Sequence, residues 1–301
     1  MVCAYTEQRW DHVVAGIEAL SAQTLAPAQV VLSVDHNDDL QRRAHDAFPG
    51  VDVVANAHEP GLSGARNTGM SQAKGDIVAF LDDDARPEPT WLETLAAAFD
   101  DPDVVGVGGV VLPEWVEGAR PAWLPAEMYW VVGCSYIGLP IDVAEIRNPI
   151  GANMAFRREA LRAAGGFVEG IGRVGTVPLG CEETELAIRI RRMTGGVVLH
   201  VPGALVHHHV PAARVTGRYF LSRCWSEGLS KALVARHTGP QAALASERAY
   251  ALTTLPLGVA RGLGDAIRGD AAGLARAAAI VTGLAVTTTG YLRGASGRRR
   301  G

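Results

Sequence analysis

Three consecutive carboxylates, Asp82, Asp83 and Asp84, directly follow the apolar run at residues 77–81. Like charges at this spacing repel one another, so the arrangement costs free energy unless a cation neutralises it. Hard divalent cations such as Mg²⁺ and Mn²⁺ bind carboxylate oxygens and bridge them to phosphate groups. The alternative is a solvated acidic turn that caps the following helix, because aspartate favours such positions. We favour the metal site, which suits a phosphate-bearing ligand.

A second acidic group consists of Glu182, Glu183 and Glu185, at the start of a helix-period stretch over residues 182–193. Several acids in one site can raise the pKa of one of them toward the working pH, as a general base requires. The structural alternative is that these glutamates only favour a helix N-terminus through the helix dipole. Without other evidence, this group favours the structural role.

Three histidines, His207, His208 and His209, follow a short strand-like run. Side chains alternate along a strand, so His207 and His209 should face one way and His208 the other. A separate zinc site lacks support, because no cysteine or further histidine is suitably spaced. The four cysteines lie far apart without a CxxC pair, which suits a reducing cytosol better than a disulfide framework.

The elements that position these residues alternate between strand and helix signals over the first 110 residues. Apolar runs of strand length lie at residues 2–5, 30–34, 51–55, 77–81 and 104–107. Helix-period stretches lie between them, at residues 13–20, 40–48, 62–73 and 92–99. Thr90 and Glu93 have the spacing of a capping box for the last of these helices. The alternation predicts a parallel sheet covered on both faces, with residues 5–7, 35–39 and 82–84 on one ligand-binding rim.

The second part of the chain has a different character. Residues 113–149 are rich in proline, glycine and aromatic residues, and we expect a loop-dominated excursion over the site. Helical patterns return at residues 158–164, 182–193 and 215–236, and again beyond Gln241. We therefore predict one α/β domain at residues 1–240 and a helical C-terminal extension at residues 241–301.

Five ordered motifs between about residues 2 and 210 resemble family 2 glycosyltransferases with the GT-A fold. The strongest match is GLSGARNTG at residues 61–69 followed by GDIVAFLDDD at residues 75–84. The others are CAYTE at residues 3–7, VLSVD at 31–35, GANMAFR at 151–157 and CEETEL at 181–186. The resemblance implies a GT-A-type nucleotide-sugar-binding fold, with a mostly parallel mixed sheet flanked by helices. The helical C-terminal extension is not covered by these motifs.

The resemblance also implies a nucleotide-sugar donor, for which we expect UDP as the nucleotide. The residues that would bind this donor are Tyr5, Thr6, Glu7, Asp35, Arg66, Asp82, Asp83 and Asn153. Among them, Asp35 would contact the nucleobase and Arg66 the base or the diphosphate, while Asp82 would lie by the ribose. Tyr5, Thr6 and Glu7 would line the nucleoside.

For the chemistry, the resemblance implies that Asp84 holds Mn²⁺ or Mg²⁺ on the diphosphate oxygens. Such an ion stabilises the leaving nucleoside diphosphate as a Lewis acid. His208 is the expected histidine ligand, with His207 as the second choice, and the alternative is that these are surface histidines. Glu183 matches the family's catalytic base, which makes the transfer inverting. The family more often has a Glu-Asp pair where this chain has Glu182 and Glu183, so the choice between these two stays open.

The charge and hydropathy of the chain indicate which partners it can bind and where in the cell we expect it. The net charge of −4 argues against a nucleic-acid binder. Residues 251–301 carry seven arginines and two aspartates, a net charge of +5. The uncharged run at residues 277–292 would span ~24 Å as a helix, short of the ~30 Å hydrocarbon core. A helix on an anionic membrane surface and a frayed soluble helix both fit this tail. We expect a cytoplasmic protein, peripheral on the inner face of the plasma membrane in the first case.

By analogy with the family, we expect the acceptor to be a glycan or lipid-linked hydroxyl in cell-surface polysaccharide or glycolipid synthesis. A retaining GT-A transferase is one alternative, and it would not need Glu183 as a base. A non-catalytic nucleotide-sugar-binding protein or membrane partner is another, but it would be expected to lose the acidic residues present here. A sugar-1-phosphate nucleotidylyltransferase should open with a glycine-rich loop carrying an arginine, which residues 2–10 do not show.

Overall fold

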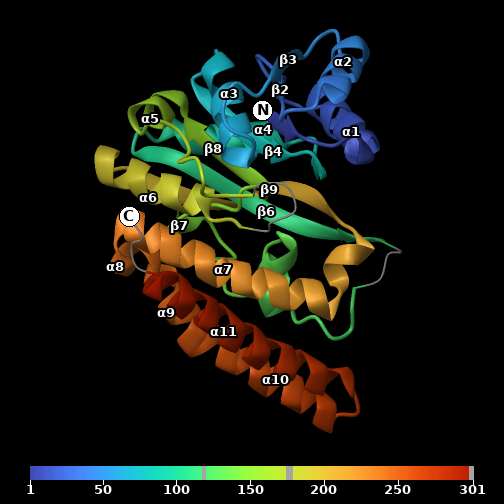
Figure 1. Cartoon of the computed structure of the whole chain (residues 1–301), viewed down its shortest axis with the longest axis vertical. Coiled ribbons are helices and arrows are strands. Elements are labelled where there is room, and N and C mark those ends of the chain that lie inside the picture. Colours follow the sequence, from blue (N-terminus) through green and yellow to red (C-terminus); the bar gives the residue numbers. More distant parts are fainter. Residues whose placement is uncertain (117–119, 174–178, 298–301) are drawn as a thin grey trace. The chain divides into compact units, whose positions relative to one another are not determined.

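The computed structural model describes residues 1–116, 120–173 and 179–297 (Figure 1). Within these residues one sheet has the strand order β3-β2-β1-β4-β8-β6-β9-β5, and β7 pairs with β9. The strands are β1 (Val2–Ala4), β2 (Val31–Val34), β3 (Asp52–Ala55), β4 (Ile77–Asp82), β5 (Ala85–Pro87), β6 (Val104–Trp115), β7 (Ala144–Ile146), β8 (Asn153–Arg157) and β9 (Val197–Val210). The α-helices are α1 (Trp10–Ser21), α2 (Asp38–Ala47), α3 (Leu62–Gln72), α4 (Trp91–Ala97), α5 (Arg158–Ala163), α6 (Glu182–Thr194), α7 (Gly217–Thr238), α8 (Pro240–Ala243), α9 (Ala245–Ala249), α10 (Leu255–Ile267) and α11 (Ala272–Ser296). Shorter turns of other helix types are η1 (Glu7–Arg9), η2 (Ala98–Asp100), η4 (Ala126–Val132), η5 (Ala212–Val215) and η6 (Tyr250–Thr254).

The strands predicted at residues 2–5, 30–34, 51–55 and 77–81 are confirmed within one residue at each end. β3, β2, β1 and β4 run parallel, with Val2 of β1 opposite Leu32 of β2 and Leu81 of β4. β8 joins β4 in the antiparallel sense, so the sheet is mixed, as expected. Because β1, β2 and β4 are adjacent and parallel, the residues that follow them lie along one edge of the sheet.

The sheet has a buried cluster on each face. Side chains alternate along β4 and β8, so Phe80 and Phe156 pack in one cluster while Leu81 and Ala155 pack in the other. Apolar faces of α1, α2 and α4 cover the second cluster, and those of α5 and α6 cover the first. This burial on both faces explains why the parallel strands are continuous apolar runs.

β6 is much longer than the strand predicted at residues 104–107. The glycines in this segment suggest a turn, but in the structure they allow close approach of neighbouring strands. A Cβ atom on Gly109 would lie 2.0 Å from the carbonyl oxygen of Ala204 and 2.5 Å from the side-chain nitrogen of Asn153. Only glycine fits there without displacing the backbone of β9.

The capping box predicted for Thr90 and Glu93 is wrong. Thr90 occupies the N-cap position of α4, but its side chain makes no capping hydrogen bond. The Glu93 carboxylate instead accepts a hydrogen bond from the Thr24 hydroxyl at 2.7 Å. A tertiary contact has therefore replaced the local one.

Contacts along the chain divide it into two compact units. The first consists of Met1–Leu112, Pro140–Val177 and Glu182–His208, and the second of Pro113–Leu139, Pro178–Cys181 and His209–Gly301. The stretch predicted as loop at residues 113–149 contains η4 and β7 within its described part. The domain boundary at residue 240 stays a prediction.

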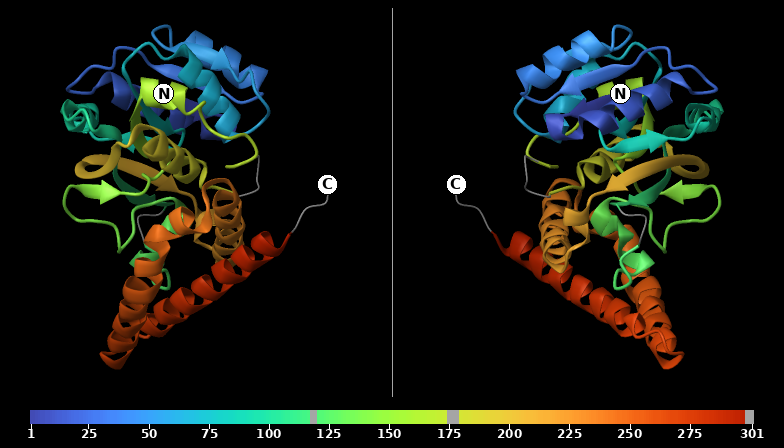
Figure 2. Two further views of the ribbon diagram at one scale, coloured as in Figure 1. Left: turned by 90° about the vertical axis from the view of Figure 1, so that its left-hand side faces the viewer. Right: turned by 90° about the vertical axis from the view of Figure 1, so that its right-hand side faces the viewer.

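In the second unit, α11 packs against both α7 and α10, and α10 turns back into α11 (Figures 1 and 2). Glycines make these contacts close. A Cβ atom on Gly228 of α7 would lie 2.1 Å from the carbonyl oxygen of Thr287, and one on Gly273 of α11 would lie 2.2 Å from that of Gly262. The helices therefore meet backbone to backbone.

α11 is longer than its uncharged run suggested, because it extends beyond residues 277–292 at both ends. Its 25 residues are enough to cross a membrane by length and composition, although only 28% of its most apolar stretch is buried in the structure. The length argument against a spanning helix is therefore wrong for the helix as a whole.

Candidate active site

The acidic turn lies where β4 ends and the chain folds back into β5. Asp82 is the last residue of β4, and Asp83 and Asp84 connect it to β5. β5 pairs with β9 so that Ala85 is opposite His208. This register brings His208 Nε2 within 3.1 Å of Asp84 Oδ1, and both side chains are 3% exposed.

Asp82, Asp84 and His208 form a candidate metal group, since one ligand atom from each lies within 4.8 Å of the other two. Two carboxylate oxygens and an imidazole nitrogen are a suitable donor set for Mn²⁺, and Mg²⁺ accepts the carboxylates. The neighbouring His207 is only half-buried, and its Nε2 lies 2.6 Å from Glu88 Oε1. The strand alternation thus places His208, and not His207, with the aspartates.

Arg9, which sequence reasoning missed, lies beside the acidic turn. Its Nη1 is 2.5 Å from Asp83 Oδ1 and 3.1 Å from Asp84 Oδ2. Burial lowers the pKa of this guanidinium, but Asp83 and Asp84 together raise it above its ordinary value. Burial and then the charge of Asp84 raise the pKa of Asp83 to about 7. The available sequence signal was an arginine on the loop that carries Tyr5, whose ring lies 5.5 Å from the guanidinium.

Arg66 of α3 joins the two acidic groups. It donates to Glu182 Oε1 at 2.8 Å and to Asp82 Oδ1 at 3.2 Å. A third hydrogen bond, at 3.1 Å, goes to the carbonyl oxygen of Gly151. Burial lowers the pKa of Arg66, but the carboxylates of Glu182 and Asp82 raise it above its ordinary value. Arg66 is therefore a buried cation that holds one carboxylate from each group.

The three glutamates at the start of α6 have different surroundings. Glu182 is buried, and its Oε2 has no hydrogen-bond partner among the described residues. Glu183 is half-buried, and its Oε1 accepts a hydrogen bond from the Thr184 hydroxyl at 3.2 Å. Glu185 forms an ion pair with Arg189 at 2.6 Å. Glu182 and Glu183 thus remain the two candidates for a base, while the ion pair of Glu185 with Arg189 stabilises α6.

On the nucleoside side, Asp35 follows β2 at the same edge of the sheet. Its Oδ1 accepts from the Asn56 amide at 2.7 Å, and its Oδ2 accepts from the Gly61 N–H at 2.9 Å. Asp35 therefore fixes the loop that leads into α3. Tyr5 is 40% exposed, and the Thr6 hydroxyl accepts a hydrogen bond from the backbone N–H of Gln8 at 3.3 Å, next to Glu7.

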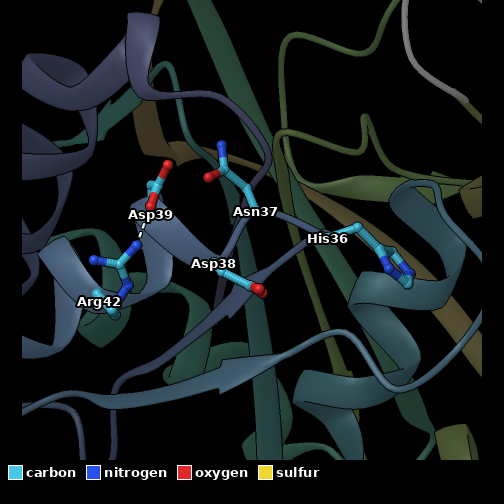
Figure 3. Close-up of a pocket in the computed structure, with 5 residues that line it drawn as sticks. All are labelled: His36, Asn37, Asp38, Asp39 and Arg42. Carbon is cyan, nitrogen blue, oxygen red and sulfur yellow. Dashed lines mark hydrogen bonds and ion pairs between the residues drawn. The ribbon is translucent and has the colours of Figure 1, made fainter.

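A pocket of about 580 Å³ opens beside Asp35, at the start of α2 (Figure 3). Its lining residues are His36, Asn37, Asp38, Asp39 and Arg42. Asn37 caps the helix by accepting from the Leu40 N–H, and Asp39 pairs with Arg42. The pocket is polar. The positive end of the α2 dipole points toward it and is already balanced by Asp38 and Asp39 in the first turn of that helix.

Asn153 is fully buried between strands. Its amide nitrogen donates to the carbonyl oxygens of Val110 and Ala204 at 3.0 and 2.8 Å, and its amide oxygen accepts from Trp91 Nε1 at 2.8 Å. Both of its N–H donors are thus used inside the protein. In this structure the side chain joins β8 to β6, β9 and α4, and Asn153 itself pairs with Leu81, the residue before Asp82.

Fold and site together define the class of protein, a glycosyltransferase of GT-A type that uses a nucleotide sugar. Residues 1–165 match Glycosyl transferase family 2, and the chain belongs to that family. It is 35% identical over 235 residues to the glucosyl-dolichyl phosphate glucuronosyltransferase of Haloferax volcanii, covering 77% of this chain and 75% of that protein. It is 28% identical over 225 residues to the pre-mycofactocin glycosyltransferase of Mycobacterium tuberculosis, covering 71% of this chain and 43% of that protein.

Solved structures show the same fold. The mannosyltransferase PcManGT of Pyrobaculum calidifontis, in complex with GDP-Man and Mn²⁺, matches with a TM-score of 0.59 and 18% identity over 96% of this chain and 86% of that chain. GalNAc-T7 with UDP, GalNAc and Mn²⁺ matches with a TM-score of 0.54 and 18% identity over 76% of this chain and 47% of that chain. These likenesses confirm the GT-A fold expected from the motifs.

Proposed function

We propose that this glycosyltransferase moves a sugar with inversion from a UDP-sugar to a hydroxyl of a lipid-linked acceptor, and that it needs a divalent cation. One observation carries the proposal. Arg66 binds Asp82 and Glu182 together, so the candidate metal group and the candidate base group belong to one site. A site that joins metal ligands to a carboxylate base is what an inverting transfer requires.

Asp82, Asp84 and His208 are the residues that would hold Mn²⁺ or Mg²⁺. Their donor atoms fit such an ion, and beside them the buried Oδ2 of Asp83 has no hydrogen-bond partner among the described residues. The bound ion would act as a Lewis acid on the departing diphosphate. Arg9 holds the second oxygen of Asp84, which leaves its first oxygen directed at His208.

Glu183 is our choice for the base. A proton taken up by Glu182 would disrupt its buried ion pair with Arg66, which opposes that role. Glu183 lies in the first turn of the same helix but is half-buried, so an acceptor hydroxyl can reach it from solvent. Glu182 then acts as a positioning residue, keeping Arg66 between the two acidic groups.

For the donor, we propose that the nucleoside lies against the loop of Tyr5, Thr6 and Glu7. The exposed ring of Tyr5, which rests on Arg9, offers a surface on which a base can stack. Asp35 shapes the adjoining wall through Gly61. Asn153 supports the sugar-binding segment from behind, since its side chain is buried.

For the acceptor and location, the name of the Haloferax relative supports a lipid-linked glycan. The apolar helix α11 and the net charge of +5 over residues 251–301 support attachment to a membrane surface. We therefore propose a peripheral protein on the cytoplasmic face of the membrane, acting in surface polysaccharide or glycolipid synthesis.

The test is nucleotide release from UDP-glucose, UDP-glucuronate, GDP-mannose and a dTDP-sugar, each with Mn²⁺ or with EDTA. We expect metal-dependent release from a UDP-sugar by the wild type and its loss in Asp84→Ala. Asp46→Asn, which removes an exposed carboxylate from α2, is the matched control and should keep full activity. Release from GDP-mannose alone would overturn the nucleotide assignment, and equal release in EDTA would overturn the metal requirement.

A second experiment separates the two glutamates and the stereochemical alternatives. Glu183→Gln should lower kcat about 10²- to 10⁴-fold and leave donor binding unchanged, as expected for a lost general base. Unchanged turnover in this variant would point to a retaining mechanism or to Glu182. Donor binding without turnover in the wild type would instead favour a nucleotide-sugar-binding protein.

A further inference from the structure

Large apolar side chains cover the outer surface of the hairpin formed by α10, its turn at residues 268–271, and α11. On α11 the exposed ones are Leu274, Val281, Leu284 and Leu292. Leu274, Val281 and Leu292 recur at spacings of 7 and 11 residues, so they share one face of the helix. On α10, Leu263 and Ile267 stand one turn apart, and Ile267 is 87% exposed.

Close packing by glycine explains why these side chains point outward. Gly262 of α10 faces Gly273 of α11, while Gly228 of α7 lies against Thr287 and Gly290 of α11. With backbones in contact, the interior of this bundle has little room for leucine. A helix exposed to water normally carries charged residues on its outer face, but α11 has none between residues 277 and 292.

Basic residues flank the apolar surface. Arg268 in the turn is 78% exposed, and Arg293 lies near the end of α11. Arg261 of α10 is 50% exposed and forms an ion pair with Glu127. Arg276 pairs with Asp265 and Asp270, so the acidic residues of the hairpin are matched within it. The sequence continues with three more arginines at residues 298–300, outside the described part. An apolar face bordered by cations is complementary to anionic lipid.

The charges also argue against a membrane-spanning arrangement of the hairpin. Its turn carries Arg268 and Asp270, which a spanning hairpin would have to take through the hydrocarbon core. α11 also packs along α7, and the middle of α7 holds the ion pairs of Glu227 with Arg223 and Lys231. A spanning α11 would draw these charged groups toward lipid.

We propose that the α10–α11 hairpin lies in the plane of an anionic bilayer, with the outer leucines, Val281 and Ile267 inserted among the lipid chains. Both helices therefore bind lipid, and neither crosses the membrane. This proposal details the membrane attachment given above. Its test requires no donor and no turnover, so its failure leaves the catalytic proposal standing.

The first experiment measures flotation of the full chain with vesicles of phosphatidylcholine alone or mixed with phosphatidylglycerol. We expect binding to the mixed vesicles that weakens at high salt. The double variant Val281→Glu/Leu292→Glu should bind about tenfold or more weakly, because it places charges on the inserted face. Ala47→Glu/Gln72→Glu, which adds the same two charges at exposed positions of α2 and α3, is the control. Equal binding of the double variant would overturn the proposal.

The second experiment separates lying on the bilayer from crossing it. Ala271→Cys in the turn and Ser296→Cys at the end of α11 are each added to preformed vesicles and treated with a membrane-impermeant maleimide, with the unsubstituted chain as background. We expect labelling of both positions, because both ends stay on the outer side. Protection of one position indicates a spanning helix and overturns the proposal. Dimer formation in solution without vesicle binding also overturns it, by assigning the apolar face to a second copy.

Discussion

The guanidinium of Arg66 and the carboxylate of Glu182 lie 2.8 Å apart, and this ion pair joins α3 to α6 inside the protein. The same arginine reaches Asp82, the last residue of β4. A single buried cation is thus shared by two acidic groups that are far apart in sequence. Its removal should affect stability and the geometry of the site together.

Arg66→Met should lower the free energy of unfolding by about 3–5 kcal/mol, the usual effect of breaking a buried ion pair, because Glu182 keeps a buried charge without its partner. Urea unfolding followed by circular dichroism measures this change. Arg42→Met, which breaks the exposed pair with Asp39 on α2, is the matched control and should change stability by at most about 1 kcal/mol. Similar losses of unfolding free energy in the two variants would show that the buried ion pair stabilises the protein no more than the exposed one.

Arg9→Met should make the stability of the protein depend on metal. The substitution leaves the buried carboxylates of Asp83 and Asp84 without their cation, so the melting temperature in EDTA should fall. Mn²⁺ should then raise the melting temperature by more than it does in the wild type, because the ion replaces the lost positive charge. Arg162→Met, at an exposed position of α5, controls for loss of any arginine. A smaller Mn²⁺ effect in Arg9→Met would contradict this account.

Glu227 should stabilise the protein most at neutral pH and progressively less as the solution becomes acidic. Burial alone would raise the pKa of Glu227, but Lys231 and Arg223 hold it well below its usual range. The native state therefore favours the ionised form, and its contribution is complete above the unfolded pKa of about 4.3. As pH falls below that value the contribution is lost progressively. The wild type should be clearly more stable than Glu227→Gln at pH 7, and the difference should shrink by pH 3 in urea unfolding. A constant difference would show that the charge of Glu227 is not its source.

Gly228→Ala should separate α7 from α11. The new methyl group would lie 2.1 Å from the carbonyl oxygen of Thr287, a backbone atom that cannot move alone. We expect a loss of about 1–3 kcal/mol, typical of overpacking. Gly217→Ala at the start of the same helix meets nothing within 4 Å and should be neutral or gain at most about 1 kcal/mol. Thermal unfolding of the two variants compares them directly, and equal stability would mean that the two helices adjust without cost.

Much of the fold could be predicted because its signals are local. Continuous apolar runs indicate buried parallel strands, and the parallel arrangement itself places Asp35 and Asp82 at one edge. Alternation along a strand placed His208 apart from His207. None of these inferences requires knowledge of which residues, distant in the sequence, are in contact in the folded protein.

The parts that escaped prediction depend on distant contacts. Arg9 meets Asp83 only after β1 and β4 have paired, and no local pattern marks that pair. Asn153 stands in a motif associated with sugar binding, yet Trp91, Val110 and Ala204 use its amide inside the protein. The glycines of β6 suggest a turn when only the sequence is considered, but in the structure they allow close contacts between strands. Tertiary packing decided each of these cases.

Arg9 and Arg66 together pair with four of the carboxylates at the site, those of Asp82, Asp83, Asp84 and Glu182. These two guanidinium groups offset half of the negative charge of the four carboxylates, so we expect the chain to fold without a bound ion. Under the proposed metal requirement, newly synthesised molecules would mature even when manganese is scarce and persist as an inactive reserve. The cell's metal supply would then govern the rate of glycan assembly, while the abundance of the enzyme stays constant.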